Sequence, residues 1–82
     1  MTKKGKLIKA IRNNLRAVRF DDACRIAEMI GFSLRGGKGS HKIYGRQDEP
    51  LLLNLQNRRG YIKPYQAKQL IDMVDKYDDE SS

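Results

Sequence analysis

The chain has 82 residues, with 17 lysines and arginines against 10 aspartates and glutamates, and a formal net charge of +7. A chain this short is expected to form one domain around one core, which disfavours an enzyme that encloses a small metabolite in a deep cleft. It has one cysteine, Cys24, and one histidine, His41, which excludes an intramolecular disulfide and a structural zinc site and indicates a protein of the reducing cytoplasm without a cofactor.

Two helices are predicted before the first strand. Leu7, Ile8, Ile11 and Leu15 recur at helical spacing, which predicts a short helix over about residues 6–15 with a basic outer face. A second helix is predicted from Asp21 or Asp22, either of which can cap its first turn, to Gly31, which suits the residue just after a helix C-terminus. Its inward stripe should contain Ala23, Ile26, Ala27 and Ile30, with Cys24 as a buried apolar residue.

Three short strands are predicted in the middle of the chain. Residues 32–35 alternate apolar and polar side chains, residues 36–39 form a glycine-rich turn, and residues 40–44 form the second strand. A polar connection over residues 45–50 leads to a third strand over residues 51–55, which places Leu51, Leu53 and Leu55 on one face and Leu52 on the other. These strands are expected to form an antiparallel meander.

A basic loop over residues 56–63 precedes the last helix, which Pro64 can begin. Its inner side should contain Ala67, Leu70, Ile71, Val74 and Tyr77, and an acidic, disordered tail is expected over residues 78–82. The order α-α-β-β-β-α predicts an α+β fold with helices on one face of a three-stranded antiparallel sheet, as one domain over residues 1–82 with a core of about 18–77. No apolar run approaches the roughly 20 residues of a transmembrane helix, so no membrane partner is expected.

Basic residues are concentrated in two regions of the chain. The first 20 residues contain seven lysines and arginines and no acidic residue, and a second basic group surrounds the predicted strands. Acidic residues gather late in the chain, from Asp72 onward. This asymmetry suits a surface that binds the phosphate backbone of a nucleic acid. It also fits a surface that docks an acidic protein, or a solvated surface with an acidic tail.

His41 lies between Lys38 and Lys42, directly after the glycine-rich segment. Histidine is the side chain whose unperturbed pKa, about 6.5, allows proton exchange near neutral pH. A base or acid of this kind can promote attack of a ribose 2′-OH on the neighbouring phosphate without a metal, while cations stabilise the developing charge. The local features alone favour an incidental hairpin histidine over a catalytic one. If Ile43 faces the helices, His41 lies on the covered face at the rim of the core.

Residues 39–44, with the sequence Gly-Ser-His-Lys-Ile-Tyr, resemble the HicA toxin family, also called YcfA-like. The mark of that family is Gly-Ser-His followed by an apolar and an aromatic residue on the second strand. Three further segments fit the family's first strand, the end of its third strand and the start of its last helix: residues 31–35, 54–56 and 63–66.

This resemblance implies a fold similar to a double-stranded RNA-binding domain and a toxin of a type II toxin–antitoxin system. Such a toxin cleaves mRNA, and a HicB-type antitoxin binds it and hides the active site. The family histidine corresponds to His41. Some members have another histidine after the third strand, where this chain has Asn57, Arg58 and Arg59.

The leading hypothesis is a metal-independent endoribonuclease that uses His41 as general acid or base. The residues predicted to bind RNA are Arg35, Lys38, Gly39, Ser40, Lys42, Arg58 and Arg59, although the last two could instead contact the antitoxin. Tyr44, Tyr61, Tyr65, a lysine or water could supply the second proton-transfer group. The alternatives are a non-catalytic RNA-binding module, which reads shape through phosphate and 2′-OH contacts, and a domain that docks an acidic protein.

Overall fold

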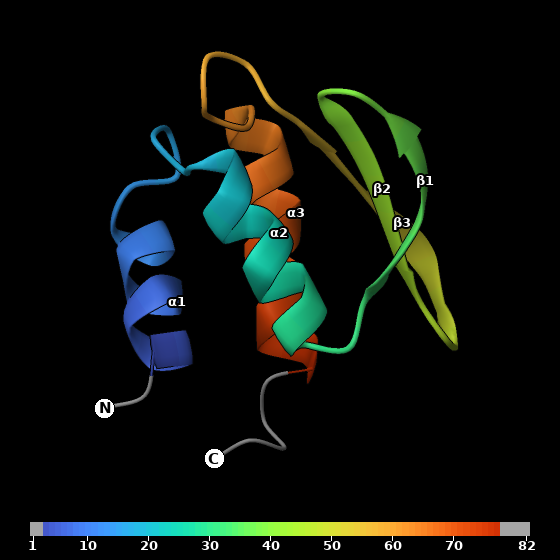
Figure 1. Cartoon of the computed structure of the whole chain (residues 1–82). Coiled ribbons are helices and arrows are strands. Elements are labelled where there is room, and N and C mark those ends of the chain that lie inside the picture. The colour runs from blue at the N-terminus through green and yellow to red at the C-terminus, as the bar shows by residue number, and fades with distance from the viewer. Residues whose placement is uncertain (1–2, 78–82) are drawn as a thin grey trace.

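The computed structural model describes residues 3–77, with side chains from Gly5 onward, and Figure 1 shows the arrangement of its elements. The helices are α1 (Lys3–Asn13), α2 (Phe20–Met29) and α3 (Pro64–Tyr77), and the strands are β1 (Ser33–Lys38), β2 (His41–Arg46) and β3 (Glu49–Gln56). Both strand pairs are antiparallel and the sheet order is β1-β2-β3. The predicted α+β order is therefore confirmed, while the predicted disordered tail lies outside the described residues.

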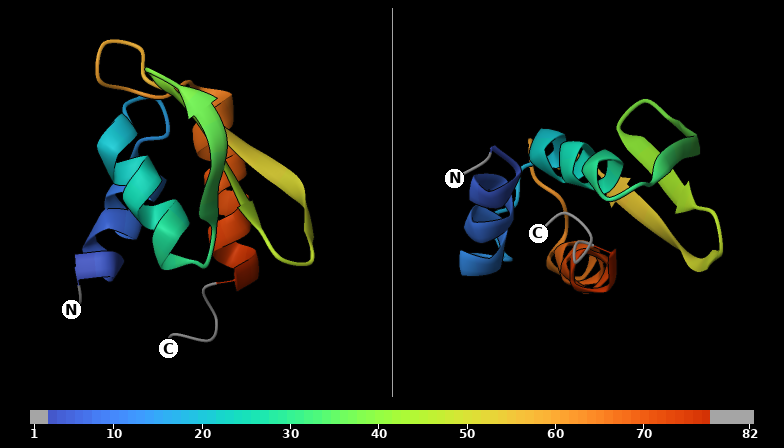
Figure 2. Two further views of the ribbon diagram at one scale, coloured as in Figure 1. Left: turned by 45° about the vertical axis from the view of Figure 1, so that its right-hand side comes forward. Right: turned by 90° about the horizontal axis from the view of Figure 1, so that it is seen from below.

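Helices α2 and α3 cover one face of the sheet, and α1 lies on the far side of these two helices (Figure 2). One cluster of buried side chains joins all three layers, since Ile8 and Ile11 of α1 belong to it together with Leu53 and Leu55 of β3. The predicted inner stripes of α2 and α3 are buried as expected, and so is Cys24, except that Tyr77 is only half-buried against the core. Because α1 contributes to the same core, its apolar stripe stabilises the fold while Lys6, Lys9 and Arg12 stay exposed.

The two ends of α2 differ from each other in how well the sequence predicts them. At the C-terminal end, Gly31 has a φ of 95°, its N–H donates to Glu28 O, and the Phe32 N–H donates to Ala27 O at 2.9 Å. This Schellman arrangement is the predicted stop. At the N-terminal end, capping by an aspartate is wrong: the cap residue is Arg19, which makes no side-chain cap, and the Phe20 N–H donates to Gly60 O at 2.9 Å.

The predicted turn over residues 36–39 is shorter than expected. Gly36 and Gly37 continue β1 and pair with Ile43 and Lys42, so that only Gly39 and Ser40 form the turn. The register shifts between Leu34 and Gly36, which marks a bulge. Gly37 has a φ of 114°, and a Cβ there would lie 2.1 Å from the carbonyl oxygen of His41, so only glycine permits this close approach of the two strands.

The two faces of the sheet are set by the residues that face the helices. Tyr44, Leu53 and Leu55 are almost fully buried, while Leu52 is 48% exposed. Since side chains alternate along a strand, Ile43 and His41 lie on the open face, away from the helices. The condition under which His41 would lie on the covered face is therefore not met, because Tyr44 rather than Ile43 fills the core.

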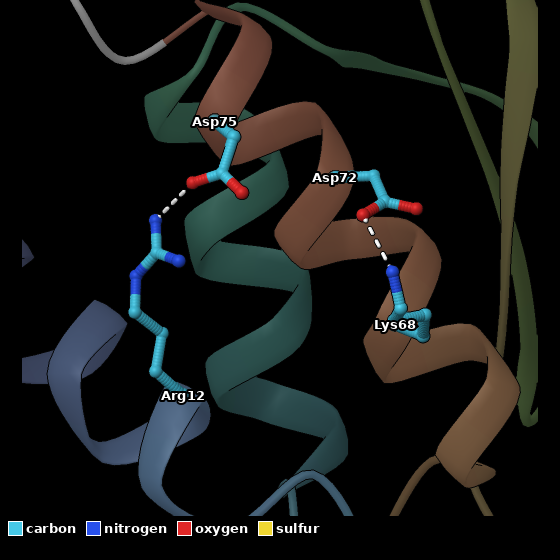
Figure 3. A network of polar contacts seen from close by, with 4 residues as sticks. All are labelled: Arg12, Lys68, Asp72 and Asp75. Atoms are coloured by element: carbon cyan, nitrogen blue, oxygen red, sulfur yellow. Dashed lines mark hydrogen bonds and ion pairs between the residues drawn. The ribbon is translucent and has the colours of Figure 1, made fainter.

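Among the described residues, two exposed ion pairs involve the helices, one between α1 and α3 and one within α3 (Figure 3). The guanidinium of Arg12 on α1 pairs with Asp75 on α3, and within α3 the Lys68 ammonium lies 3.0 Å from Asp72. Exposed pairs of this kind contribute less than about 1 kcal/mol, so the buried stripe of α1 holds it in place more than Arg12 does. Within residues 3–77, no helix combines the length and apolar character needed to cross a membrane.

Candidate functional site

His41 is the first residue of β2, and its side chain is exposed on the open face of the sheet. Its register partners are Lys38 on β1 and Gln56 on β3. Directly opposed residues of antiparallel strands share a face, with Cβ atoms about 4.5–5.5 Å apart. The His41 side chain is therefore flanked by Lys38 on one side and Gln56 on the other, in a position that a large substrate can reach.

The turn that precedes His41 is joined to the loop over residues 57–63. The carbonyl of Ser40 accepts a 2.7 Å hydrogen bond from the Asn57 N–H, which continues the β2–β3 ladder by one residue. Arg58 and Tyr61 then exchange backbone hydrogen bonds of 2.8 and 3.1 Å around Arg59 and Gly60. Positive φ values of 55° and 92° at these two central residues are typical of a primed hairpin turn, which Gly60 favours.

Gln66 in the first turn of α3 closes this loop from beneath. Its side chain is buried, and its Oε1 accepts hydrogen bonds of 3.2 Å from the backbone N–H groups of both Gln56 and Lys63. The two ends of the loop are thus tied to one amide oxygen. Sequence reasoning used Gln66 only as a family landmark and did not predict this positioning role. The available signal was a glutamine at the third position of a helix that a proline begins, because glutamine there can accept a hydrogen bond from the N–H of the residue before the helix.

The structure brings only some of the predicted RNA-binding residues together. Lys38 ends β1 opposite His41, Gly39 and Ser40 form the turn between them, and Arg58 and Arg59 follow in the adjoining loop. The others lie apart. Arg35 is on the open face beside Gly45, four residues along β2 from His41, or roughly 13 Å. Lys42 points to the helix side, where its Nζ lies 5.8 Å from the centre of the Phe20 ring.

Tyr44 cannot act as the proton-transfer partner of His41, because it faces the opposite side of the sheet. It is 1% exposed, and its hydroxyl donates a 3.2 Å hydrogen bond to Glu28 Oε2 on α2. Burial, followed by a hydrogen bond with Cys24, raises the pKa of Tyr44 well above its ordinary value. Burial likewise raises the pKa of the Cys24 thiol, which fits the predicted unreactive cysteine.

The loop over residues 57–63 forms an open pocket of about 390 Å³, which we call the loop pocket. It is lined by Arg58, Arg59, Tyr61, Ile62, Lys63 and Pro64. Sequence reasoning placed Arg58 and Arg59 in the candidate site but did not assign Lys63 or the ring of Tyr61 to a common pocket with them. The signal was present in the spacing, since an aromatic residue interleaved with three cations is typical of nucleic-acid contacts.

The candidate site lies at one end of the molecule, which we call the basic end (Figure 1). The β1–β2 turn, the loop over residues 57–63 and the N-termini of α2 and α3 meet there. Its cations include Lys38, Arg58, Arg59 and Lys63, and the positive ends of two helix dipoles point the same way. Chemically, this arrangement can hold phosphates and offers one exposed imidazole to take up or donate a proton.

Comparison of the chain with protein-family models, with curated proteins and with solved structures gives no match. Within residues 3–77, no three histidine, cysteine, aspartate or glutamate side chains gather as metal ligands. The candidate site therefore rests on the geometry around His41 and on the resemblance of residues 39–44 to the HicA motif.

Proposed function

We propose that the chain is a toxin of a type II toxin–antitoxin system, a HicA-type endoribonuclease that cleaves mRNA in the cytoplasm without a metal. The observation that supports this best is the exposed imidazole of His41, flanked by Lys38 at the basic end. A HicB-type antitoxin would neutralise the toxin by covering this end, where basic side chains suit an acidic partner surface.

In the proposed reaction, His41 removes the proton of a ribose 2′-OH, whose oxygen then attacks the adjacent phosphorus. The bond from phosphorus to the 5′-oxygen breaks, which leaves a cyclic phosphate and a 5′-hydroxyl. Lys38 holds the phosphate as negative charge develops. The N–H groups of Gly39 and Ser40, in the turn that follows Lys38, can add hydrogen bonds to it. A second group must protonate the leaving oxygen. Lys38 is the titratable residue that the register places opposite His41, and water is the other candidate.

The first prediction is that His41→Ala abolishes toxicity and RNA cleavage. The wild type, His41→Ala and the surface control Gln47→Ala are expressed separately in a bacterial host that lacks the antitoxin. Wild type and Gln47→Ala should arrest growth, whereas His41→Ala should not, because loss of a general acid or base typically reduces the rate about 10²–10⁴-fold. Purified proteins should show the same order of RNA cleavage in the presence of a chelator. Equal cleavage by all three would refute catalysis by His41.

One observation favours a non-catalytic RNA-binding module as the second candidate. Among the described residues, no side chain hydrogen-bonds the imidazole of His41, whereas a catalytic base is commonly oriented by a third group. Such a module would bind RNA in a salt-dependent manner, would not cleave it at any protein concentration, and would bind equally well after His41→Ala.

A further inference from the structure

The loop pocket combines features that recognise an unpaired nucleotide. Arg58, Arg59 and Lys63 supply three cations, and Tyr61, which is 43% exposed, supplies an aromatic ring among them. Ile62 at the back of the pocket is buried. Arginine and lysine bind phosphates without reading sequence, and an aromatic ring stacks with any base that is free of a duplex.

The frame of the pocket is held in place from several sides. Gly60 N–H donates to the side-chain oxygen of Asn57 at 2.7 Å, and Gly60 O accepts from the first residue of α2. The Ile62 N–H donates to Val18 O at 2.9 Å, so the segment also pairs with the link between α1 and α2. A pocket built on such a frame presents Tyr61 without a large cost in loop ordering on binding.

The pocket is also close to His41 along the sheet. Gln56 is the register partner of His41, and Arg58 follows two residues later, which corresponds to roughly 7 Å along an extended chain. A strand of RNA with a phosphate at His41 and Lys38 can therefore place a neighbouring nucleotide over the loop.

We propose that the loop pocket binds one unpaired nucleotide of a single-stranded RNA, with its base stacked on Tyr61 and the adjacent phosphates on Arg58, Arg59 and Lys63. This inference rests on the proposed function, and it defines the substrate class of that site. A base held in a duplex cannot present its face to Tyr61, so single-stranded RNA is bound in preference to duplex RNA.

The test measures binding of a short 2′-O-methyl oligonucleotide, which lacks the attacking hydroxyl and cannot be cleaved, by fluorescence anisotropy. Tyr61→Leu should weaken binding about 5-fold to 100-fold, as expected for loss of one base–aromatic contact. Tyr61→Phe keeps the ring and should bind like the wild type. Leu52→Ala is the control, because Leu52 is an exposed apolar residue on the open face of β3 that does not line the pocket. The same oligonucleotide annealed to its complement should bind more weakly than the single strand.

The outcomes separate this inference from the proposed function. If Tyr61→Leu binds the oligonucleotide as tightly as the wild type, the pocket does not bind a base, even when RNA cleavage depends on His41. The same conclusion follows if Tyr61→Leu leaves RNA binding intact but abolishes association with a HicB-type protein. If Tyr61→Leu weakens RNA binding but the wild type does not cleave RNA, the nucleotide-binding role of the pocket is supported and the endoribonuclease activity is refuted. Absence of any RNA binding at low salt overturns both.

Discussion

At the scale of single residues, function and stability are divided between the two faces of β2. His41 and Ile43 lie on the open face, while Lys42 and Tyr44 lie on the helix side. The ring of Tyr44 fills the core and its hydroxyl reaches Glu28, so this side chain links the sheet to α2. His41 makes no such link, and its substitution should leave the core unchanged.

The prediction for Tyr44→Phe follows from this division. Loss of the hydroxyl removes the hydrogen bond to Glu28 and keeps the packing of the ring, so the free energy of unfolding should fall by about 1 kcal/mol. Urea denaturation followed by circular dichroism measures this loss. RNA cleavage by the folded variant should equal that of the wild type. A large loss of cleavage without a loss of stability would mean that Tyr44 transfers a proton, which contradicts the structure.

The faces of β2 could not be predicted from the sequence because Ile43 and Tyr44 are both large and both favour strands. Turning either Ile43 or Tyr44 towards the helices would bury a large side chain. Tyr44 is the one that faces them because its hydroxyl contacts Cys24 and Glu28 of α2, which are distant in sequence. The third strand was predictable because Leu53 and Leu55 alternate with a polar residue. The loop pocket was not, because it depends on a contact between Gln66 and the backbone of two separate residues.

At the scale of elements, a buried carboxylate at the start of β3 joins the sheet to the C-terminal end of α3. Oε1 of Glu49 accepts hydrogen bonds from Lys76 Nζ at 2.6 Å and from the Tyr77 hydroxyl at 2.5 Å, and its Oε2 accepts from the Leu51 N–H at 2.9 Å. The Tyr77 ring also receives the guanidinium of Arg46 at 4.1 Å from its centre. The sequence placed Glu49 in a polar connection, so this junction was not predicted.

Acid should weaken this junction in a defined pH range. The hydrogen bond from Lys76, followed by those from Tyr77 and Leu51, lowers the pKa of Glu49 from 4.5 to about 2. Because the pKa of Glu49 is lower in the folded chain than in the unfolded chain, Glu49 contributes fully to stability at a pH above 4.5. This contribution is lost as the pH falls from 4.5 to about 2. Urea midpoints measured across this range should fall less steeply for Glu49→Gln and for Lys76→Met than for the wild type. Three parallel pH profiles would show that Glu49 titrates alike in the folded and unfolded chains.

At the scale of the whole molecule, four cations that make no ion pair among the described residues gather at the basic end. Lys38, Arg58, Arg59 and Lys63 lie there, and Asp21 and Asp22 in the first turn of α2 partly offset them. Beside the C-terminus of α3, the carboxylate of Glu49 is instead paired with Lys76, and the Arg46 guanidinium lies over the Tyr77 ring. An RNA strand approaching such a molecule is oriented towards the basic end before any specific contact forms.

The salt dependence of RNA binding should identify the cations that contact phosphates. Each phosphate neutralised on a single strand adds about 0.7 to the slope of log K against log salt concentration, because counterions are released. Arg58→Gln in the His41→Ala background should therefore reduce the magnitude of the slope by about 0.7 for an uncleavable single strand. Lys6→Gln removes the same charge from an exposed position on α1, whose N-terminus lies at the other end of the molecule (Figure 1), and should leave the slope nearly unchanged. If both variants reduce the slope equally, RNA is held by the net charge of the whole surface, and the basic end is not a defined binding site.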